Sequence, residues 1–324
     1  MRAIRCHELT GPKSLRVDEV PAPTPRTGEV LIEVRAAGVN FPDVLMTYGK
    51  YQFKADPPFI PGGEAAGVVR AVGGGVTAVA PGDRVVASLM SGGYAELIVV
   101  SETAVVKLPE AVPFEVGAAT LLTYATTLHA LVDRAALQSG ESLLVLGAAG
   151  GVGTAAIELG RLLGARVIAA ASTDEKVAYC KTMGAAEGIN YATEDLKERA
   201  KALTHGSGAN VIFDAVGGPY ADAALRSIAW EGRYLVVGFA AGEIPKVPLN
   251  LVLLKGCQII GVFWGSFATR DPAKNRSNAE RILAWVAGGK LHPHVDAVLK
   301  FDDVQQALER MERREVKGKL VLVP

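Results

Sequence analysis

Residues 142–164, SLLVLGAAGGVGTAAIELGRLLG, constrain the fold of this chain more than any other stretch. The apolar run 143–146 is typical of a strand buried on both faces, and the glycine-rich turn 147–153 follows it directly. A helix rich in small residues then continues to about Gly164. A strand, a tight glycine turn and a helix in this order predict the opening unit of a dinucleotide-binding domain.

The glycine turn departs from the usual G-x-G-x-x-G pattern at one position, because Ala148 stands where the first glycine is expected. Gly150 lets the backbone approach a pyrophosphate, and Gly153 lets the helix pack closely on the strand. The helix N-terminus offers free N–H groups and the positive end of its dipole to phosphates. We therefore expect the turn to bind a cofactor through Ala149, Gly150, Gly151, Val152 and Gly153.

The rest of the chain predicts an insertion of one domain into another. Short β-rich segments separated by Gly and Pro turns occupy residues 1–118, and a short helix and loop are expected within residues 38–51. Strands alternate with helices in the middle of the chain, which favours a parallel, doubly wound sheet. The last strand, residues 319–323, is expected to return to the first domain's sheet. The strands expected in the two domains are 29–36, 66–72, 84–88, 95–100, 143–146, 166–171, 188–190, 211–216 and 233–237.

Some helix boundaries are also predicted. An apolar helix is expected from about Glu115, and a helix that begins near residues 172–175 ends at Gly184. A capping box of Ser277 and Glu280 predicts a helix that runs through Trp285. Asp302 or Asp303 caps another.

Composition and charge exclude several classes of function. The formal net charge of the 324 residues is zero, and no basic block is present, which argues against nucleic acid and anionic membranes as partners. The uncharged run 142–157 is too short to span a bilayer, and the first residues lack the apolar core of a signal peptide. Three widely spaced cysteines, Cys6, Cys180 and Cys257, fit a reducing cytoplasm. A small-molecule substrate is therefore expected.

Motifs spread along the whole chain give it a family resemblance. They are GVNFPDVL at 38–45, PFIPGGEAAGVV at 58–69, PGDRV at 81–85, the glycine turn, and KGKLVLV at 317–323. With these motifs the sequence resembles the zinc-free quinone oxidoreductase (zeta-crystallin-like) branch of the medium-chain dehydrogenase/reductase superfamily. The resemblance implies an α/β fold in which a Rossmann domain, 119–257, is inserted in a discontinuous GroES-like β-rich domain, 1–118 and 258–324.

No metal is expected. The zinc alcohol dehydrogenases of this superfamily place a Cys near the position of Asn40 and a His before the Glu of a G-H-E motif, which is Gly62-Gly63-Glu64 here. The cysteine-rich lobe of their structural zinc has no counterpart between Val86 and Tyr94. The five histidines have no ligand spacing with any Cys, and the pair His292 and His294 is better explained as a solvated loop.

The end of the second Rossmann strand indicates NADPH as the cofactor. NAD enzymes place an acidic residue there, whereas this chain has Ala170-Ala171-Ser172. The resemblance implies that Ser172, Lys176 and Tyr191 hold the 2′-phosphate of NADPH. The acidic residues at 174 and 175 weaken this inference only a little, because acidic residues are favoured in the first turn of any helix.

The resemblance also suggests the residues around the reacting atoms. Asn40 and Tyr51 are expected to hydrogen-bond the substrate oxygen that becomes negative during hydride transfer. Equally simple alternatives are that Asn40 caps a helix and that Tyr51 is a half-buried loop aromatic. The remaining residues expected at the cofactor, some of which could instead be core residues, are Thr123, Gly238, Phe239, Val262, Phe263, Trp264 and Lys319.

The leading hypothesis is an NADPH-dependent, metal-free reductase that transfers hydride to a quinone. Two alternatives stay open. One is a reductase of α,β-unsaturated carbonyl, enoyl or 2-substituted acrylate substrates, and the other is an NADPH-binding structural or RNA-contacting protein with little turnover. The apolar stretch 256–267 is expected to form the contact of a homodimer or a higher homo-oligomer.

Overall fold

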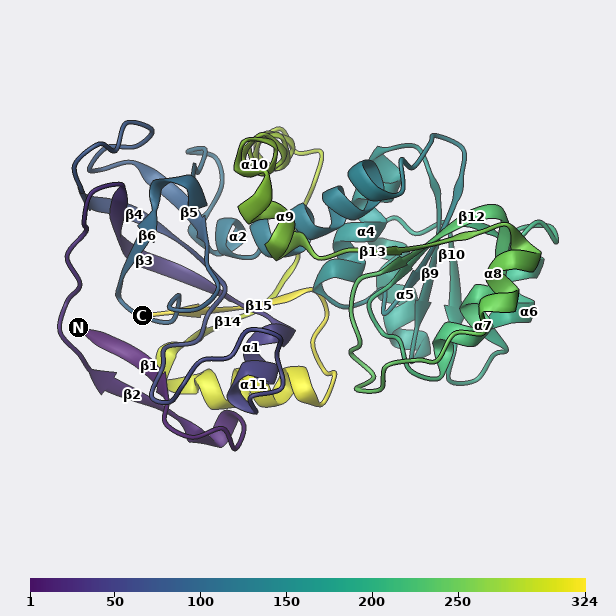
Figure 1. Ribbon diagram of the computed structural model, residues 1–324, viewed down its shortest axis with the longest axis horizontal. Coiled ribbons are helices and arrows are strands. Elements are labelled where there is room, and N and C mark those ends of the chain that lie inside the picture. Colours follow the sequence, from purple (N-terminus) through teal and green to yellow (C-terminus); the bar gives the residue numbers. More distant parts are fainter. The chain divides into compact units, whose positions relative to one another are not determined.

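The computed structural model describes residues 1–324 and divides into two compact units (Figure 1). Unit 1 comprises Met1–Ala125 and Gly265–Pro324, and unit 2 comprises Thr126–Trp264. The inserted unit therefore begins and ends later than the expected bounds, 119 and 257. It ends later because the strand Gln258–Gly261 pairs with the sheet of unit 2. No helix is long and apolar enough to cross a bilayer.

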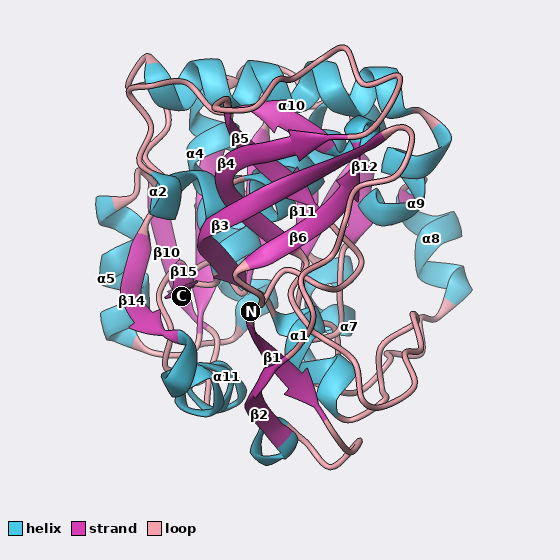
Figure 2. Ribbon diagram, turned by 90° about the vertical axis from the view of Figure 1, so that its left-hand side faces the viewer, coloured by secondary structure: helices cyan, strands magenta, loops and turns pink.

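Unit 1 is built on a seven-stranded sheet of order β14-β15-β3-β4-β5-β7, in which β6 pairs with β3 (Figure 2). All its pairings are antiparallel except that of β14 with β15. A separate hairpin joins β1 and β2. The strands are β1 (Arg2–Cys6), β2 (Leu15–Glu19), β3 (Glu29–Val39), β4 (Glu64–Val72), β5 (Arg84–Ser88), β6 (Leu97–Ser101), β7 (Val105–Lys107), β14 (Val295–Lys300) and β15 (Lys319–Val323).

The two ends of the chain meet in unit 1, because β15 lies against β3 as expected, with Leu320 opposite Val39 (Figure 1). Its core contains alternate residues of β3, such as Val30 and Ile32, together with Phe301 from the C-terminal segment. The helices of unit 1 are α1 (Phe41–Thr47), α2 (Phe114–Ala118), α9 (Trp264–Arg270, which starts at the unit boundary), α10 (Pro272–Ala287) and α11 (Val304–Glu312).

Two expected helices differ in the structure. The apolar helix after Glu115 is interrupted, because π-helical turns at Leu121–Ala125 and His129–Arg134 flank the short α3 (Thr126–Leu128). The helix predicted to open at Ser277 begins at Pro272 instead. Asp271 is its N-cap and accepts a hydrogen bond from the Lys274 N–H, so the true cap lies one and a half turns upstream.

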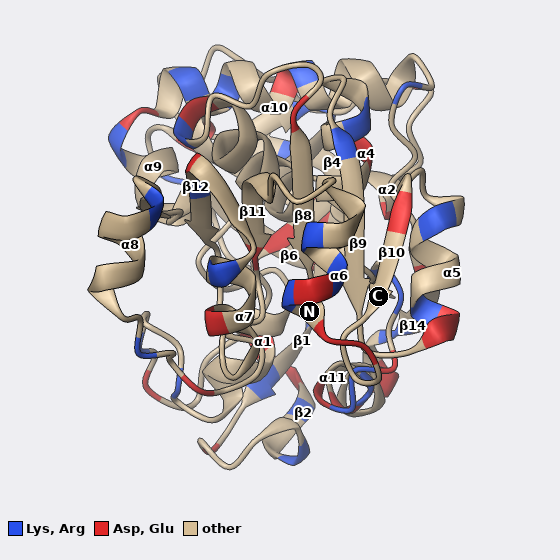
Figure 3. Cartoon of the chain, turned by 90° about the vertical axis from the view of Figure 1, so that its right-hand side faces the viewer, with Lys and Arg blue, Asp and Glu red and all other residues tan.

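Unit 2 is a doubly wound sheet of six parallel strands in the order β10-β9-β8-β11-β12-β13. Numbered from β8, this is the 3-2-1-4-5-6 order of dinucleotide-binding domains, and the order reverses between β8 and β11. Helices that carry both signs of charge, such as α5, α6 and α7, surround the sheet (Figure 3). The elements are β8 (Ser142–Leu146), α4 (Gly151–Leu162), β9 (Arg166–Ala171), α5 (Asp174–Thr182), β10 (Glu187–Asn190), α6 (Leu196–Leu203), β11 (Ala209–Asp214), α7 (Tyr220–Arg226), β12 (Ile228–Val236), α8 (Leu249–Lys255) and β13 (Gln258–Gly261).

Candidate active site

The glycine turn of unit 2 joins the buried strand β8 to the helix α4, and Gly150 is the N-cap of that helix. A Cβ atom on Gly153 would collide with the Gly147 carbonyl oxygen and lie 2.7 Å from the Ala148 Cα atom. Both neighbours are backbone and cannot move aside. The close packing of helix on turn therefore requires glycine at this position.

Gly150 is different, because nothing in the protein requires a glycine there. Its φ of −80° suits any residue, and an added Cβ would meet only the Gly147 oxygen, at 3.4 Å. The first hydrogen bond of the turn into α4 is donated by the Thr154 N–H to the Gly150 oxygen. The N–H groups of the three residues before Thr154 thus lack intrahelical acceptors and fit the oxygens of a pyrophosphate close to Gly150.

The other residues of unit 2 expected at the cofactor all follow strands of the parallel sheet. The carboxyl ends of these strands lie at one edge of the sheet, where ligands of doubly wound domains bind. The topology therefore places these residues along a single edge. They are Ser172 after β9, Lys176 in the first turn of α5, Tyr191 after β10, Gly238 and Phe239 after β12, and Val262, Phe263 and Trp264 after β13.

The end of β9 carries no carboxylate, since the strand ends in the buried Ala170 and Ala171. Thr173 caps α5 by accepting a hydrogen bond from the Lys176 N–H. The Asp174 carboxylate accepts a hydrogen bond of 2.8 Å from the Asn190 side chain. Asp174 is thus hydrogen-bonded to the end of β10. Because no acid stands at the end of β9 itself, the region beside this strand end suits a phosphate.

A buried acid, Asp214, lies at the end of β11, although no site residue was predicted there. Asp214 accepts hydrogen bonds from the Val216 and Gly217 N–H groups and, at 2.5 Å, from the Tyr234 hydroxyl. Asp214 thereby holds the loop that follows β11 against the strand β12. A cavity of about 160 Å³, lined in part by Asp214 and Phe239, lies beside them. The pattern V-I-F-D-A-V-G-G, an acid at a strand end before two glycines, is the signal that could have revealed it.

Unit 1 holds a buried polar cluster, which we define as Asn40, Asp43, Glu64, Tyr94 and Lys319. At its centre the Lys319 ammonium donates hydrogen bonds to the Val39 carbonyl at 3.0 Å and to the Asn40 and Glu64 side chains at 2.5 Å each. These three bonds use all three of its protons. The charged group of Lys319 therefore lies within this cluster, and its contact with the cofactor stays a prediction.

The Asn40 side chain is committed in the same way. Its amide nitrogen donates to the Glu64 carboxylate at 2.9 Å and to the Gly38 carbonyl at 3.3 Å, and its oxygen accepts from Lys319. Both amide hydrogens are thus used within the protein, and the residue is 4% exposed. Asn40 is also the N-cap of α1, which agrees with the simpler alternative, and its hydrogen bond to the substrate oxygen stays a prediction.

Tyr51 remains available as a hydrogen-bond donor. Its side chain is half-buried, and no protein group bonds its hydroxyl. Burial raises its pKa, and the negative charge of Asp43 raises it further, so the phenol stays protonated. Thr123, by contrast, is buried in the π-helical turn, where its hydroxyl donates to the Ala119 carbonyl at 3.1 Å.

Three cluster members, Asp43, Glu64 and Tyr94, were not among the candidate functional residues. Asp43 accepts hydrogen bonds from the Asn40 N–H at 2.8 Å and from the Tyr94 hydroxyl at 2.7 Å. Burial raises the pKa of Asp43 to about 6 and that of Tyr94 well above its usual range. The spacing Asn40-x-x-Asp43, typical of a helix start, was the available signal for Asp43. No sequence pattern predicts Tyr94 as a functional residue.

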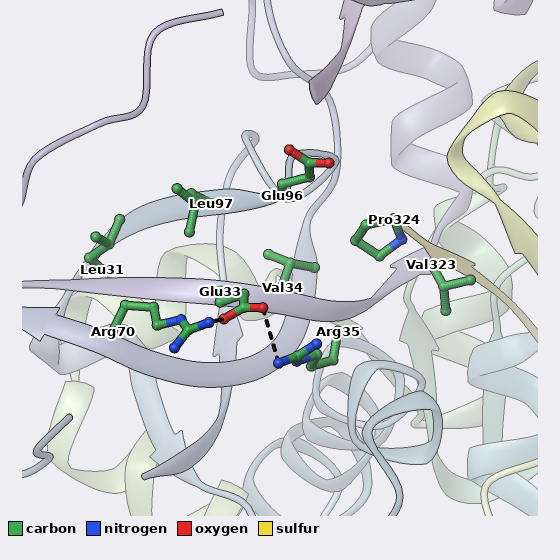
Figure 4. A pocket seen from close by; sticks show the side chains of 9 residues that line it. All are labelled: Leu31, Glu33, Val34, Arg35, Arg70, Glu96, Leu97, Val323 and Pro324. Atoms are coloured by element: carbon green, nitrogen blue, oxygen red, sulfur yellow. Dashed lines mark ion pairs between the residues drawn. The ribbon is translucent and has the colours of Figure 1, made fainter. Parts of the chain in front are cut away.

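The structure shows no group of three or more His, Cys, Asp or Glu side chains placed to bind a metal ion. A groove of about 610 Å³ lies in unit 1 where β3, β4 and β6 meet the C-terminal residues (Figure 4). Within it Glu33 forms ion pairs with Arg35 and Arg70. None of the expected site residues lines it, so it is separate from the candidate active site. Its lining residues are Leu31, Glu33, Val34, Arg35, Arg70, Glu96, Leu97, Val323 and Pro324.

The fold and the glycine turn together define a dinucleotide-binding protein. Family models described as "Alcohol dehydrogenase GroES-like domain" and "Zinc-binding dehydrogenase" match residues 26–110 and 151–287. The chain is 39% identical over 324 residues to the Nematostella vectensis "Quinone oxidoreductase-like protein 2 homolog", covering 99% of this chain and 88% of that protein. It is 33% identical over 326 residues to the human "Quinone oxidoreductase", covering 100% and 98%.

A solved structure agrees with these relatives. The Escherichia coli quinone oxidoreductase complexed with NADPH superposes with a TM-score of 0.94 at 29% identity, and the match covers 100% of both chains. The chain therefore belongs to the quinone oxidoreductase family of the medium-chain dehydrogenase/reductase superfamily, as the motifs predicted.

Proposed function

We propose that this protein is an NADPH-dependent, metal-free reductase that transfers hydride to a quinone. The observation that carries the proposal is the glycine turn of unit 2, in which no protein atom lies closer than 3.4 Å to a Cβ built on Gly150, so a pyrophosphate could approach the backbone there. Relatives named quinone oxidoreductase, and the NADPH in the Escherichia coli structure, support the choice of acceptor and cofactor.

NADPH, when bound, supplies a hydride from its nicotinamide ring, which is oxidised while the acceptor is reduced. The chain's task is to hold the acceptor and stabilise the negative charge that develops on its oxygen. Tyr51 fits that task because its hydroxyl is protonated and bonds no protein group. The proton that completes the reduction comes from water.

The preference for NADPH over NADH rests on the end of β9. Ala171 and Ser172 replace the acid that would bond the ribose hydroxyls of NAD, and Lys176 supplies a positive charge one helical turn away. A phosphate held by Ser172, Lys176 and Tyr191 would gain charge-assisted hydrogen bonds, which are the strong ones.

A panel of acceptors tests the proposal. The purified protein is mixed with NADPH or NADH and with benzoquinones, naphthoquinones, enones, enoyl thioesters and 2-substituted acrylates, and cofactor absorbance is followed. We expect quinones to be reduced fastest, with NADPH. Brisk acrylate or enone reduction without quinone turnover would overturn the choice of acceptor, and NADPH binding without any turnover would favour a binding protein.

We also infer that two copies of the chain pair through β13. This strand is the free edge of the sheet of unit 2, and large apolar side chains lie exposed near it in sequence, among them Leu253 at 79% and Phe263 at 56%. Light scattering is expected to show a dimer, and Ile259→Asp, on the half-exposed face of β13, a monomer. A monomeric wild-type protein would refute this pairing.

A further inference from the structure

Asp214, at the carboxyl end of β11, holds two loops at the cofactor edge of unit 2. Its Oδ1 atom accepts hydrogen bonds from the Val216 N–H at 2.8 Å and from the Gly217 N–H at 2.9 Å. Its backbone oxygen accepts from the Val237 N–H at 2.9 Å and from the Gly238 N–H at 3.3 Å. One residue therefore binds both the loop that follows its own strand and the loop that follows the neighbouring strand β12.

The second carboxylate oxygen joins the Asp214 side chain to β12 itself. Oδ2 accepts a hydrogen bond of 2.5 Å from the Tyr234 hydroxyl, and Asp214 is 3% exposed. Burial raises the pKa of Tyr234, and the negative charge of Asp214 raises it further, so the hydroxyl stays protonated and donates. All the partners of the side chain are donors, so it serves as an acceptor only, as an ionised carboxylate does.

The two loops also contact each other beside Phe239. The Ala241 N–H donates to the Val216 carbonyl at 2.9 Å, which ties the second loop to the first. A Cβ atom on Gly217 would lie 2.8 Å from the Phe239 ring, so the ring packs directly on the loop after β11. The position of Phe239 therefore depends on where that loop is held.

A cavity limits how far packing alone can fix Phe239. Asp214, Tyr234 and Phe239 all line the cavity of about 160 Å³ beside β12. Side chains that face a void have no contacts on that side. The hydrogen bonds to Asp214 therefore contribute more to holding these loops than they would in a closely packed region.

The strand order places these loops on the nicotinamide side of the cofactor edge. A dinucleotide crosses the sheet where the strand order reverses, which is between β8 and β11 here. The pyrophosphate site proposed at Gly150 follows β8, so the two halves of the cofactor extend from it in opposite directions. The residues proposed for the 2′-phosphate follow β9 and β10, which leaves the ends of β11 and β12 for the nicotinamide half. These residues are Ser172, Lys176 and Tyr191.

We propose that Asp214 is a positioning residue that orients the nicotinamide half of NADPH through the loop of Gly238 and Phe239. Asp214 acts by holding this loop and the loop after β11, and not by touching the cofactor. This inference rests on the proposed function, because it takes NADPH as the cofactor and the turn at Gly150 as its pyrophosphate site. Loss of the Asp214 bonds should therefore weaken binding of the nicotinamide half and leave the adenosine half in place.

Asp214→Ala, which removes every side-chain bond of this residue, tests the proposal with two ligands. The Kd for NADPH is expected to rise by about tenfold, whereas the Kd for adenosine 2′,5′-bisphosphate, which has no nicotinamide ring, should change by less than about twofold. Titration calorimetry measures both. Single-turnover hydride transfer to a quinone at saturating NADPH should also slow by about tenfold, because the ring is misplaced even when the cofactor is bound.

Two milder variants should give a graded result. Asp214→Asn keeps an oxygen for the Val216 and Gly217 N–H groups, and its amide can donate to the Tyr234 hydroxyl oxygen, so NADPH binding should be close to wild type. Tyr234→Phe removes only the bond to Oδ2. Its Kd for NADPH is expected to rise by roughly two- to threefold, with the bisphosphate unaffected.

Glu141→Ala is the matched control. Glu141 also joins a loop to β12, since its carboxylate accepts hydrogen bonds from Arg233 at 2.8 Å and 2.5 Å. It directly precedes β8, however, and so lies at the amino ends of the strands, away from the cofactor edge. This variant is expected to lose stability in thermal unfolding while its Kd values for both ligands stay at wild type.

The outcomes separate the two proposals. A wild-type protein that does not bind NADPH would overturn the proposed function. If wild type binds NADPH, an equal weakening of the two ligands in Asp214→Ala, or no weakening of either, would overturn only the role of Asp214. If Asp214→Ala does not fold, Tyr234→Phe decides, and a wild-type Kd for NADPH together with a wild-type rate of hydride transfer would overturn that role. If the bisphosphate does not bind the wild-type protein, the rate of hydride transfer decides in the same way.

Discussion

The cofactor edge of unit 2 and the buried cluster of unit 1 are built in different ways. The cofactor edge of unit 2 consists mainly of backbone: a glycine turn, a helix N-terminus and loops after parallel strands. The cluster of unit 1 consists of side chains from segments far apart in the sequence, since 279 positions separate Lys319 from Asn40. A backbone site tolerates most changes of side chain and fails where a Cβ intrudes, whereas a buried charge network fails when one partner is lost.

Lys319→Met should have the largest effect. It removes the only cation of the cluster and leaves Glu64 buried and uncompensated, which costs roughly 3–5 kcal/mol of unfolding free energy. Chemical denaturation measures this loss. The double variant with Glu64→Met is expected to be more stable than Lys319→Met alone, and a double variant no better than that single one would show that the pair is not coupled.

Two glycine variants should separate effects on protein stability from effects on NADPH binding in unit 2. Gly153→Ala pushes a Cβ into the backbone of the turn and is expected to destabilise the protein by about 1–3 kcal/mol, with loss of NADPH affinity. Gly150→Ala is expected to weaken NADPH binding while stability changes little. Thermal unfolding and fluorescence titration measure both. Equal destabilisation by the two variants would contradict the assignment of Gly150 to the ligand.

Lys176→Ala should have the smallest of these effects and the most selective. NADPH binding is expected to weaken by roughly tenfold, since a charge-assisted hydrogen bond contributes about 1.5–3 kcal/mol. NADH binding should barely change, because NADH lacks the 2′-phosphate. Titration of both cofactors by fluorescence gives the comparison, and an equal effect on the two would rule out a 2′-phosphate contact.

The contrast between the two regions also explains what could be predicted from sequence. The unbroken apolar run of β8 and the spacing of the glycine turn are local signals, and residues 166–171 and 319–323 form strands with the expected bounds. The cluster has no local signal beyond Asn40-x-x-Asp43. Which atoms bond Lys319 depends on strand register, so the contacts of Asn40 and Lys319 within the cluster could not be predicted from the sequence.

The helix errors have the same origin. The predicted start at Ser277 came from a local capping pattern, but Asp271 followed by a proline gives an earlier cap that the chain uses. No glycine or proline stands within residues 118–134, so no local signal predicts the interruption of the apolar helix after Glu115. Its π-helical turns arise within a run of buried small and apolar residues, where nothing in the sequence marks a change of helix type.

The steady-state reduction of a quinone by Tyr51→Phe tests the central claim most directly. Removing the proposed donor to the oxyanion is expected to lower kcat by roughly 100-fold while the Kd for NADPH stays unchanged, because the phenol acts on the acceptor and not on the cofactor. Wild-type kcat in this variant would contradict the assignment of Tyr51 as the group that stabilises the acceptor oxygen.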